Sequence, residues 1–180
     1  MNEHPSNIKI EKGYVHVYTG NGKGKSTAAF GLAIRAACAG KNVFIGQFVK
    51  DMKYSETAIT QIMPNIEIEQ LGKGCFISQD PKEEDHLAAC AAMKVCGEKL
   101  SSGSYDVIVL DEIFIALKYQ LLEERVVLDA IAQRAPHVDV VLTGRYASDA
   151  FINMADLVTE MKEIKHYYHQ GVLSRKGIDC

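Results

Sequence analysis

A strand, a glycine-rich turn and the start of a helix follow one another within residues 14–26, Tyr-Val-His-Val-Tyr-Thr-Gly-Asn-Gly-Lys-Gly-Lys-Ser. Val15 and Val17 alternate with polar positions, as in a strand, and an alanine-rich stretch of helical spacing begins straight after Lys25 and Ser26. In a phosphate-binding loop this order of elements points several backbone N–H groups at one anion. The stretch therefore predicts a nucleotide site on an α/β fold.

The side chains of this loop suit a bound polyphosphate and its cation. The glycines let the backbone wrap tightly, Lys25 supplies a mobile positive charge, and the hydroxyl of Ser26 suits Mg²⁺, or Mn²⁺ in its place. The general spacing G-x-x-x-x-G-K-[ST] would put the first glycine at Thr19, whereas here it falls at Gly20. A tight turn with an incidental lysine is the alternative. As a phosphate loop, it predicts these binding residues: Gly20, Asn21, Gly22, Lys23, Gly24, Lys25, Ser26 and Thr27.

Strand-like and helix-like stretches alternate along the rest of the chain. This alternation predicts a three-layer α/β fold with a mainly parallel central sheet, of the P-loop NTPase, RecA-like type. We expect a flexible N-terminal arm at 1–12 and a single nucleotide-binding domain at 13–180. The predicted strands are 14–19, 42–50, 66–69, 106–112, 138–143 and 157–160, and the predicted helices are 25–39, 56–62, 83–101, 113–120, 123–133 and 148–154.

Charged side chains follow two of the apolar stretches. Asp111 and Glu112 end the run Asp106–Leu110, and either carboxylate can hold the cation opposite Ser26, directly or through water. Arg145 follows Thr-Gly after another strand and can brace the polyphosphate as charge develops. A solvated strand end and a surface ion pair are the alternatives. Because ligands bind at the carboxyl ends of parallel strands, all three side chains become site candidates.

Composition limits the class of protein. Of the 180 residues, 47% are hydrophobic and 24% are charged, and the net charge of −3 does not indicate a nucleic-acid partner. No apolar run is long enough to span a membrane, and the first residues carry no secretory signal. The odd number of scattered cysteines indicates reduced thiols in the cytoplasm.

Near the end of the sequence, His166 lies beside three further ring side chains, Tyr167, Tyr168 and His169. These rings can stack on a ligand ring, or they can simply pack against the rest of the protein.

The chain resembles the P-loop ATP:cob(I)alamin (corrinoid) adenosyltransferases, including the cob(I)yrinic acid a,c-diamide type. The resemblance starts at the loop Thr19–Gly31, whose glycine offset is the family's own form. It covers nearly the whole chain, through the stretches Gly46–Lys50, Gly74–Ile77, Leu110–Glu112, Leu142–Arg145, Ala155–Glu160, Lys165-His166 and Lys176–Asp179.

This resemblance implies transfer of the 5′-deoxyadenosyl group of ATP to the Co(I) of cobalamin, cobinamide or cob(I)yrinic acid a,c-diamide, with release of triphosphate. Lys25, Glu112 and Arg145 would then be catalytic, and Ser26, Asp111 and Glu112 would hold Mg²⁺. The corrinoid would lie over the loop that contains Cys75, Phe76 and Ile77, and His166 would contribute to binding. A homodimer and an external flavin or flavoprotein reductant are also implied. From the residues alone, a P-loop small-molecule kinase and a nucleotide-gated switch ATPase remain alternatives.

Overall fold

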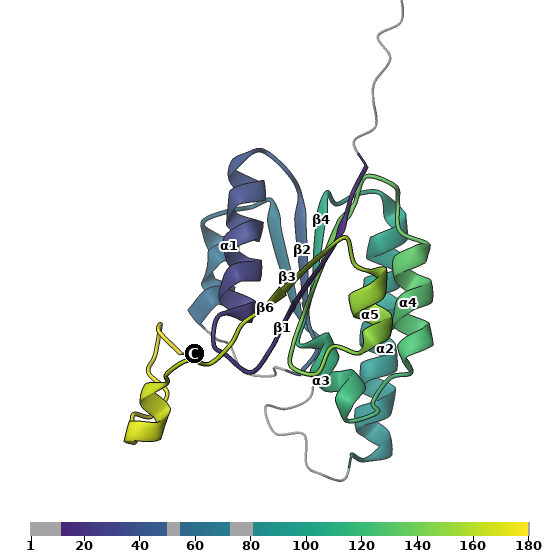
Figure 1. Ribbon diagram of the computed structural model, residues 1–180. Helices are drawn as coiled ribbons and strands as arrows, with labels where there is room; N and C mark the ends of the chain where they lie inside the picture. The colour runs from purple at the N-terminus through teal and green to yellow at the C-terminus, as the bar shows by residue number, and fades with distance from the viewer. Residues whose placement is uncertain (1–11, 50–54, 73–80, 180) are drawn as a thin grey trace, which may run out of the picture.

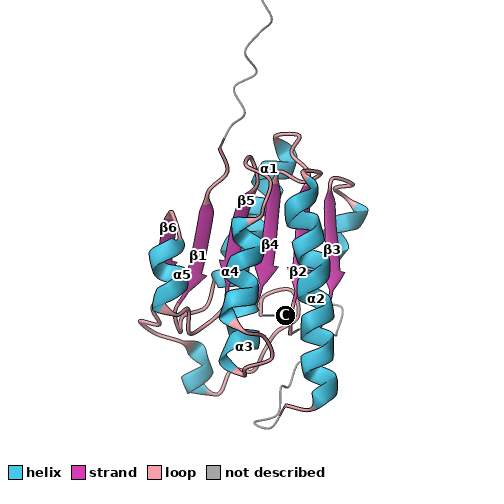
Figure 2. Cartoon of the chain, turned by 90° about the vertical axis from the view of Figure 1, so that its right-hand side faces the viewer, coloured by secondary structure: helices cyan, strands magenta, loops and turns pink. Residues whose placement is uncertain are grey.

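The computed structural model describes residues 12–49, 55–72 and 81–179, which form a layered α/β structure (Figure 1). Its centre is a parallel sheet in the order β3-β2-β4-β5-β1-β6 (Figure 2). The strands are β1 (Val15–Thr19), β2 (Val43–Gln47), β3 (Ile66–Gln70), β4 (Val107–Asp111), β5 (Asp139–Thr143) and β6 (Leu157–Glu160). The predicted P-loop NTPase-like fold is confirmed, and all described strand pairs are parallel.

Helices cover both faces of the sheet (Figure 1). One face carries α1 (Lys25–Cys38), with the 3-10 helix η1 (Ser55–Gln61) beside it. The other face carries α2 (Glu83–Ser102), α3 (Ile113–Lys118), α4 (Glu124–Ala132) and α5 (Asp149–Met154). A second 3-10 helix, η2 (Tyr167–Gln170), follows β6. Among the described residues, no helix is long and apolar enough to cross a membrane.

The β4 strand is buried on both faces, and this burial explains why its sequence is a continuous apolar run. Val107 and Val109 pack into the cluster on the α1 face, while Ile108 and Leu110 pack into the cluster on the opposite face. A strand alternates its side chains between the two faces, so a strand buried on both sides needs apolar residues throughout. Fully burying one such side chain contributes about 1.5–3 kcal/mol. The edge strand β6, by contrast, is exposed along its whole length.

Most element boundaries agree with the prediction to within about two residues, and the differences have local causes. The segment predicted as a short helix at 56–62 is the 3-10 helix η1. The helix expected over 113–120 ends at Lys118, because the chain turns at Gln120, where φ is 56°. The predicted arm at 1–12 falls almost entirely outside the described residues.

Candidate nucleotide site

The glycine-rich loop joins β1 to α1 at the carboxyl edge of the sheet, and the backbone that follows β6 supports it. The N–H of Gly22 donates to the carbonyl oxygen of Met161 at 2.7 Å. A Cβ atom at Gly20 would lie 2.4 Å from that same oxygen, and one at Gly22 would lie 2.8 Å from it. Gly24 has open space around its Cα but a φ of 120°, which L side chains rarely adopt. Gly20 and Gly22 therefore allow close packing against residues 161–162, and Gly24 allows a positive φ that other residues rarely adopt.

Lys25 is held under the loop. Its side chain is buried, and its Nζ donates to the carbonyl oxygens of Gly20 at 2.9 Å and Gly22 at 2.8 Å. Burial lowers the pKa of Lys25 below its usual range, the carboxylate of Glu112 opposes that shift, and the guanidinium of Arg145 adds to it. Glu112 and Arg145, the other two predicted catalytic residues, thus lie within electrostatic reach of Lys25.

Three polar side chains end neighbouring strands on the α1 face of the sheet. Gln47, Asp111 and Thr143 follow the buried residues of β2, β4 and β5 that point towards α1, and all three are completely buried. The Oδ1 atom of Asp111 accepts from Thr143 Oγ1 at 2.8 Å and from Ser26 Oγ at 2.8 Å. Its Oδ2 atom accepts from Gln47 Nε2 at 3.1 Å. Asp111 is therefore the buried centre of a hydrogen-bond network with Ser26, Gln47 and Thr143, and it orients the hydroxyl of Ser26.

Glu112 lies on the cavity side of this centre. It has a φ of 61°, a left-handed conformation uncommon for a residue with a side chain, and it directly precedes α3. Its N–H donates to Thr143 Oγ1 at 2.9 Å, so the same hydroxyl that supports Asp111 also supports this turn. Gly144, at φ 135°, packs so closely on Phe114 that a Cβ atom would lie 2.9 Å from it. Arg145 follows and lines the cavity with Glu112.

The cavity has a volume of about 970 Å³ and runs from the loop to the segment that follows β6. Most of the predicted site residues line it, namely Asn21, Gly22, Lys23, Gly24, Lys25, Ser26, Thr27, Glu112, Arg145 and His166. Gly20 lies behind the loop against Met161, and Asp111 lies beneath Ser26. The predicted corrinoid residues Cys75, Phe76 and Ile77 lie outside the described residues.

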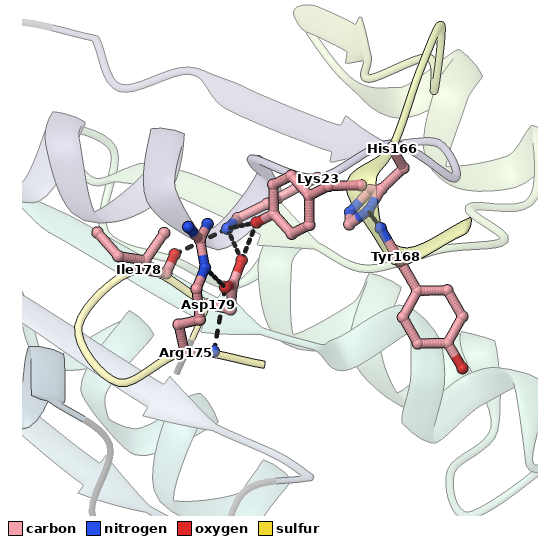
Figure 3. A network of polar contacts seen from close by, with 7 residues as sticks. Lys23, His166, Tyr168, Arg175, Ile178 and Asp179 are labelled. Atoms are coloured by element: carbon pink, nitrogen blue, oxygen red, sulfur yellow. Dashed lines mark hydrogen bonds and ion pairs between the residues drawn. The ribbon is translucent and has the colours of Figure 1, made fainter. Parts of the chain in front are cut away.

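Residues after β6 close one side of the cavity. Lys23 Nζ donates to Tyr167 Oη at 2.9 Å and to the carbonyl oxygen of Ile178 at 2.8 Å, and it forms an ion pair with Asp179 (Figure 3). The ring of His166 lies 4.7 Å from that of Tyr167, centroid to centroid, so these aromatic side chains pack on one another and also line the cavity.

Gln47, Thr143 and Asp179 are not among the site residues predicted from the sequence. Gln47 and Thr143 carried a usable signal, because each is the polar last residue of a strand whose alternate positions are apolar. Asp179 lies in a stretch that carries the family resemblance, but its pairing with Lys23 had no local signal, since Lys23 lies 156 residues away.

The loop, the buried lysine beneath it and the parallel sheet define a P-loop nucleotide-binding protein. The fold is similar to the crystal structure of the RadB recombinase, with a TM-score of 0.50 and 11% identity over 87% of this chain and 78% of that one. At that identity the likeness concerns the fold alone.

Sequence comparison carries the assignment further. Residues 11–180 match the model of the family described as ATP:corrinoid adenosyltransferase BtuR/CobO/CobP. The chain is 36% identical to a corrinoid adenosyltransferase of Pseudomonas aeruginosa, over 99% of this chain and 89% of that protein. It is also 36% identical to the corrinoid adenosyltransferase CobA of Salmonella typhimurium, over 94% of this chain and 86% of that protein. The chain therefore belongs to the ATP:corrinoid adenosyltransferase family, and the enzyme is a transferase.

Proposed function

We propose that this enzyme moves the 5′-deoxyadenosyl group of ATP onto the Co(I) of cobalamin, cobinamide or cob(I)yrinic acid a,c-diamide and releases triphosphate. The observation that supports this reaction best is the buried Lys25, whose ammonium lies beneath the loop with Glu112 and Arg145 on the same cavity. These groups are suited to holding a polyphosphate.

The reaction requires that the triphosphate leaving group be stabilised. Co(I) is a strong nucleophile, so its electron pair forms the Co–C bond to C5′ of the ribose while the C5′–O bond breaks. The electrons of that bond leave with the triphosphate, and no protein base has to remove a proton. The loop amides, Lys25 and Arg145 would then stabilise the triphosphate, and a desolvated ammonium interacts more strongly with it than an exposed one.

The residues around Ser26 fit a magnesium ion bound together with phosphates. Mg²⁺ in such sites takes a hydroxyl, one or two carboxylates and phosphate oxygens, all of which are hard oxygen ligands. Ser26 donates its hydrogen to Asp111, which leaves the lone pairs of its oxygen available to a cation. Glu112 supplies a carboxylate on the cavity wall. We assign Ser26 and Glu112 to the ion and Asp111 to orienting Ser26. Bound there, the ion would neutralise part of the triphosphate charge.

The corrinoid would enter from the same edge of the sheet. The β3 strand ends at Gln70, parallel to β2, so the chain leaves it at the carboxyl edge where the loop also lies. Cys75, Phe76 and Ile77 begin four positions after Leu71 in the sequence, and we propose that Phe76 and Ile77 face the corrin. The homodimer, the flavin or flavoprotein reductant, the cytoplasmic setting and the single domain at 13–180 stay predictions.

The phosphorus product tests this function. We would supply ATP, Mg²⁺ and cobalamin already reduced to Co(I), and follow the reaction by ³¹P NMR and by the visible spectrum of the corrinoid. The expected products are triphosphate and a light-sensitive Co–C adduct in equal amounts. ADP, or ADP with phosphate, as the sole phosphorus product in the reduced assay would refute the proposal.

A further inference from the structure

The segment of residues 163–179 forms one wall of the nucleotide cavity. It follows β6 and extends away from the sheet beside the start of α1 (Figure 1). The side chains it gives to the cavity are mostly aromatic or aliphatic and include His166, Tyr168, Val172, Leu173 and Ile178. The opposite side of the cavity is the glycine-rich loop, whose amides and Lys25 suit phosphates. The two sides therefore differ in chemistry, and the 163–179 segment suits the adenosine half of a nucleotide.

Lys23 connects this wall to the loop. Among the hydrogen bonds between described residues, those that join the 163–179 segment to the rest of the chain all start at the Lys23 ammonium. They end on Tyr167 Oη, the carbonyl oxygen of Ile178 and the carboxylate of Asp179 (Figure 3). One loop side chain thus binds both ends of the segment, near η2 and near residue 179.

Asp179 is the charged centre of this connection. Its carboxylate also accepts from Arg175 Nε at 3.0 Å and from the backbone N–H of Arg175 at 3.1 Å. The hydrogen bonds from Lys23 and Tyr167 hold the pKa of Asp179 well below its usual range, and the bond to Asp179 raises the pKa of Lys23. Both Lys23 and Asp179 are therefore charged at neutral pH.

Apolar packing contributes little to holding the wall in place. Ile164 is 92% exposed, Leu173 is 75% exposed and Tyr168 is 66% exposed. A segment with so little buried apolar surface opens readily unless specific polar contacts hold it. Its position over the cavity thus depends strongly on the Lys23 contacts.

We infer that Asp179 is a positioning residue that, by binding Lys23, holds the 163–179 segment over the cavity as the binding wall for the adenosine half of ATP. This inference rests on the nucleotide role proposed above. It requires that loss of the Asp179 charge weakens binding of ATP, which uses both walls, more than binding of inorganic triphosphate, which uses the loop alone. Lys23, once released from Asp179, remains available to phosphates, so triphosphate binding is unchanged or tighter.

The test compares two probes on the full chain. Isothermal titration calorimetry with Mg²⁺ would give the Kd of ATP and of inorganic triphosphate for the wild type and for Asp179→Asn. If the variant keeps the wall closed only about one tenth to one fifth of the time, the Kd of ATP rises about fivefold to tenfold. The Kd of triphosphate should stay within about twofold of wild type or fall. Trypsin should also cut after the exposed Lys165 faster in the variant.

Three other variants separate positioning from general damage. Asp179→Glu keeps the charge and should restore most of the ATP affinity. Asp129→Asn removes a carboxylate from α4, on the opposite face of the sheet, and should leave both probes unchanged. Tyr167→Phe keeps the ring but removes one hydroxyl from the Lys23 contacts, and should weaken ATP binding about twofold to threefold. This milder variant gives a second test if Asp179→Asn unfolds.

The outcomes are distinct. Equal weakening of both probes in Asp179→Asn would mean that the loop itself is damaged, and would overturn the positioning role. An ATP affinity within twofold of wild type would overturn it as well. If the wild type binds neither probe, the nucleotide role proposed above fails and this inference fails with it.

Discussion

Thr143 offers the sharpest test of how the site is built, because one hydroxyl supports both acidic residues. Its Oγ1 donates to Asp111 Oδ1 at 2.8 Å and accepts from the N–H of Glu112 at 2.9 Å. Thr143→Val replaces the hydroxyl with a methyl group, so it removes both hydrogen bonds without leaving a cavity. The loss of these two hydrogen bonds is therefore the main effect of the variant.

The expected loss follows mainly from the burial of Thr143 and Asp111, since the contact with the N–H of Glu112 is only part-buried. Thr143 and Asp111 are completely buried, so water cannot replace the hydrogen bond between them. A hydrogen bond to a charged group contributes about 1.5–3 kcal/mol, and a buried N–H left without a partner costs about 1–3 kcal/mol. Because the two bonds share one hydroxyl they need not add, and we expect a loss of about 3 kcal/mol. For a chain of this length that corresponds to a fall in Tm of roughly 6–12 °C.

Urea unfolding followed by far-ultraviolet circular dichroism measures this loss. The matched control is Thr159→Val, the same substitution at an exposed position of β6, which should change the free energy of unfolding by less than about 0.5 kcal/mol. Freed from Thr143, the left-handed turn at Glu112 should also relax, so magnesium-dependent ATP binding should weaken. If Thr143→Val unfolds within 0.5 kcal/mol of wild type, the hydroxyl does not hold this centre and the reasoning is wrong.

Three further predictions concern the loop and the sheet edge. Lys25→Met keeps the buried stem and removes the charge, so kcat/KM for corrinoid adenosylation should fall about 10²- to 10³-fold, and a loss of less than tenfold would contradict its role. Gly20→Ala adds a backbone clash to an unfavourable φ, whereas Gly24→Ala meets only the φ penalty of about 1–2 kcal/mol. Chemical denaturation should therefore show a larger loss in the free energy of unfolding for Gly20→Ala. Equal losses in the two variants would count against the packing argument. Hydrogen bonds from Lys99, the larger effect, and from Tyr105 lower the pKa of Glu67 below its ordinary value of 4.5. The Glu67 carboxylate therefore stabilises the fold fully above pH 4.5, and this contribution is lost as the pH falls through the lowered pKa. Glu67→Gln should flatten this acid dependence below about pH 4.5 in urea titrations, and an unchanged slope would refute the assignment.

The order and type of the elements follow from short-range patterns. The period-two alternation at Val15 and Val17, the helical spacing after Lys25 and the apolar run that ends at Asp111 each reflect neighbours along the chain. Parallel strands place their carboxyl ends at one edge, so the clustering of the loop, Glu112 and Arg145 was also predictable, and the cavity brings them together.

The choice between Asp111 and Glu112 needed the tertiary structure. Both carboxylates end the same strand, but alternation directs Asp111 to the α1 face, where Ser26, Gln47 and Thr143 surround it. Glu112 leaves the strand through a left-handed turn towards the cavity. That turn is held by a hydroxyl from another strand, so no pattern around residue 112 could reveal it.

Local patterns in the sequence were enough to identify the loop, the alternation of strands and helices and the family. The pairs of distant side chains that meet, such as Lys23 with Asp179 across 156 positions of the chain, follow from the three-dimensional fold. Local patterns depend on residues a few positions apart, whereas a contact of that range depends on the packing of the whole sheet and on the path of the chain after β6. The residues of the loop and of the facing wall therefore both contributed to the sequence prediction, whereas the contacts that join the two did not.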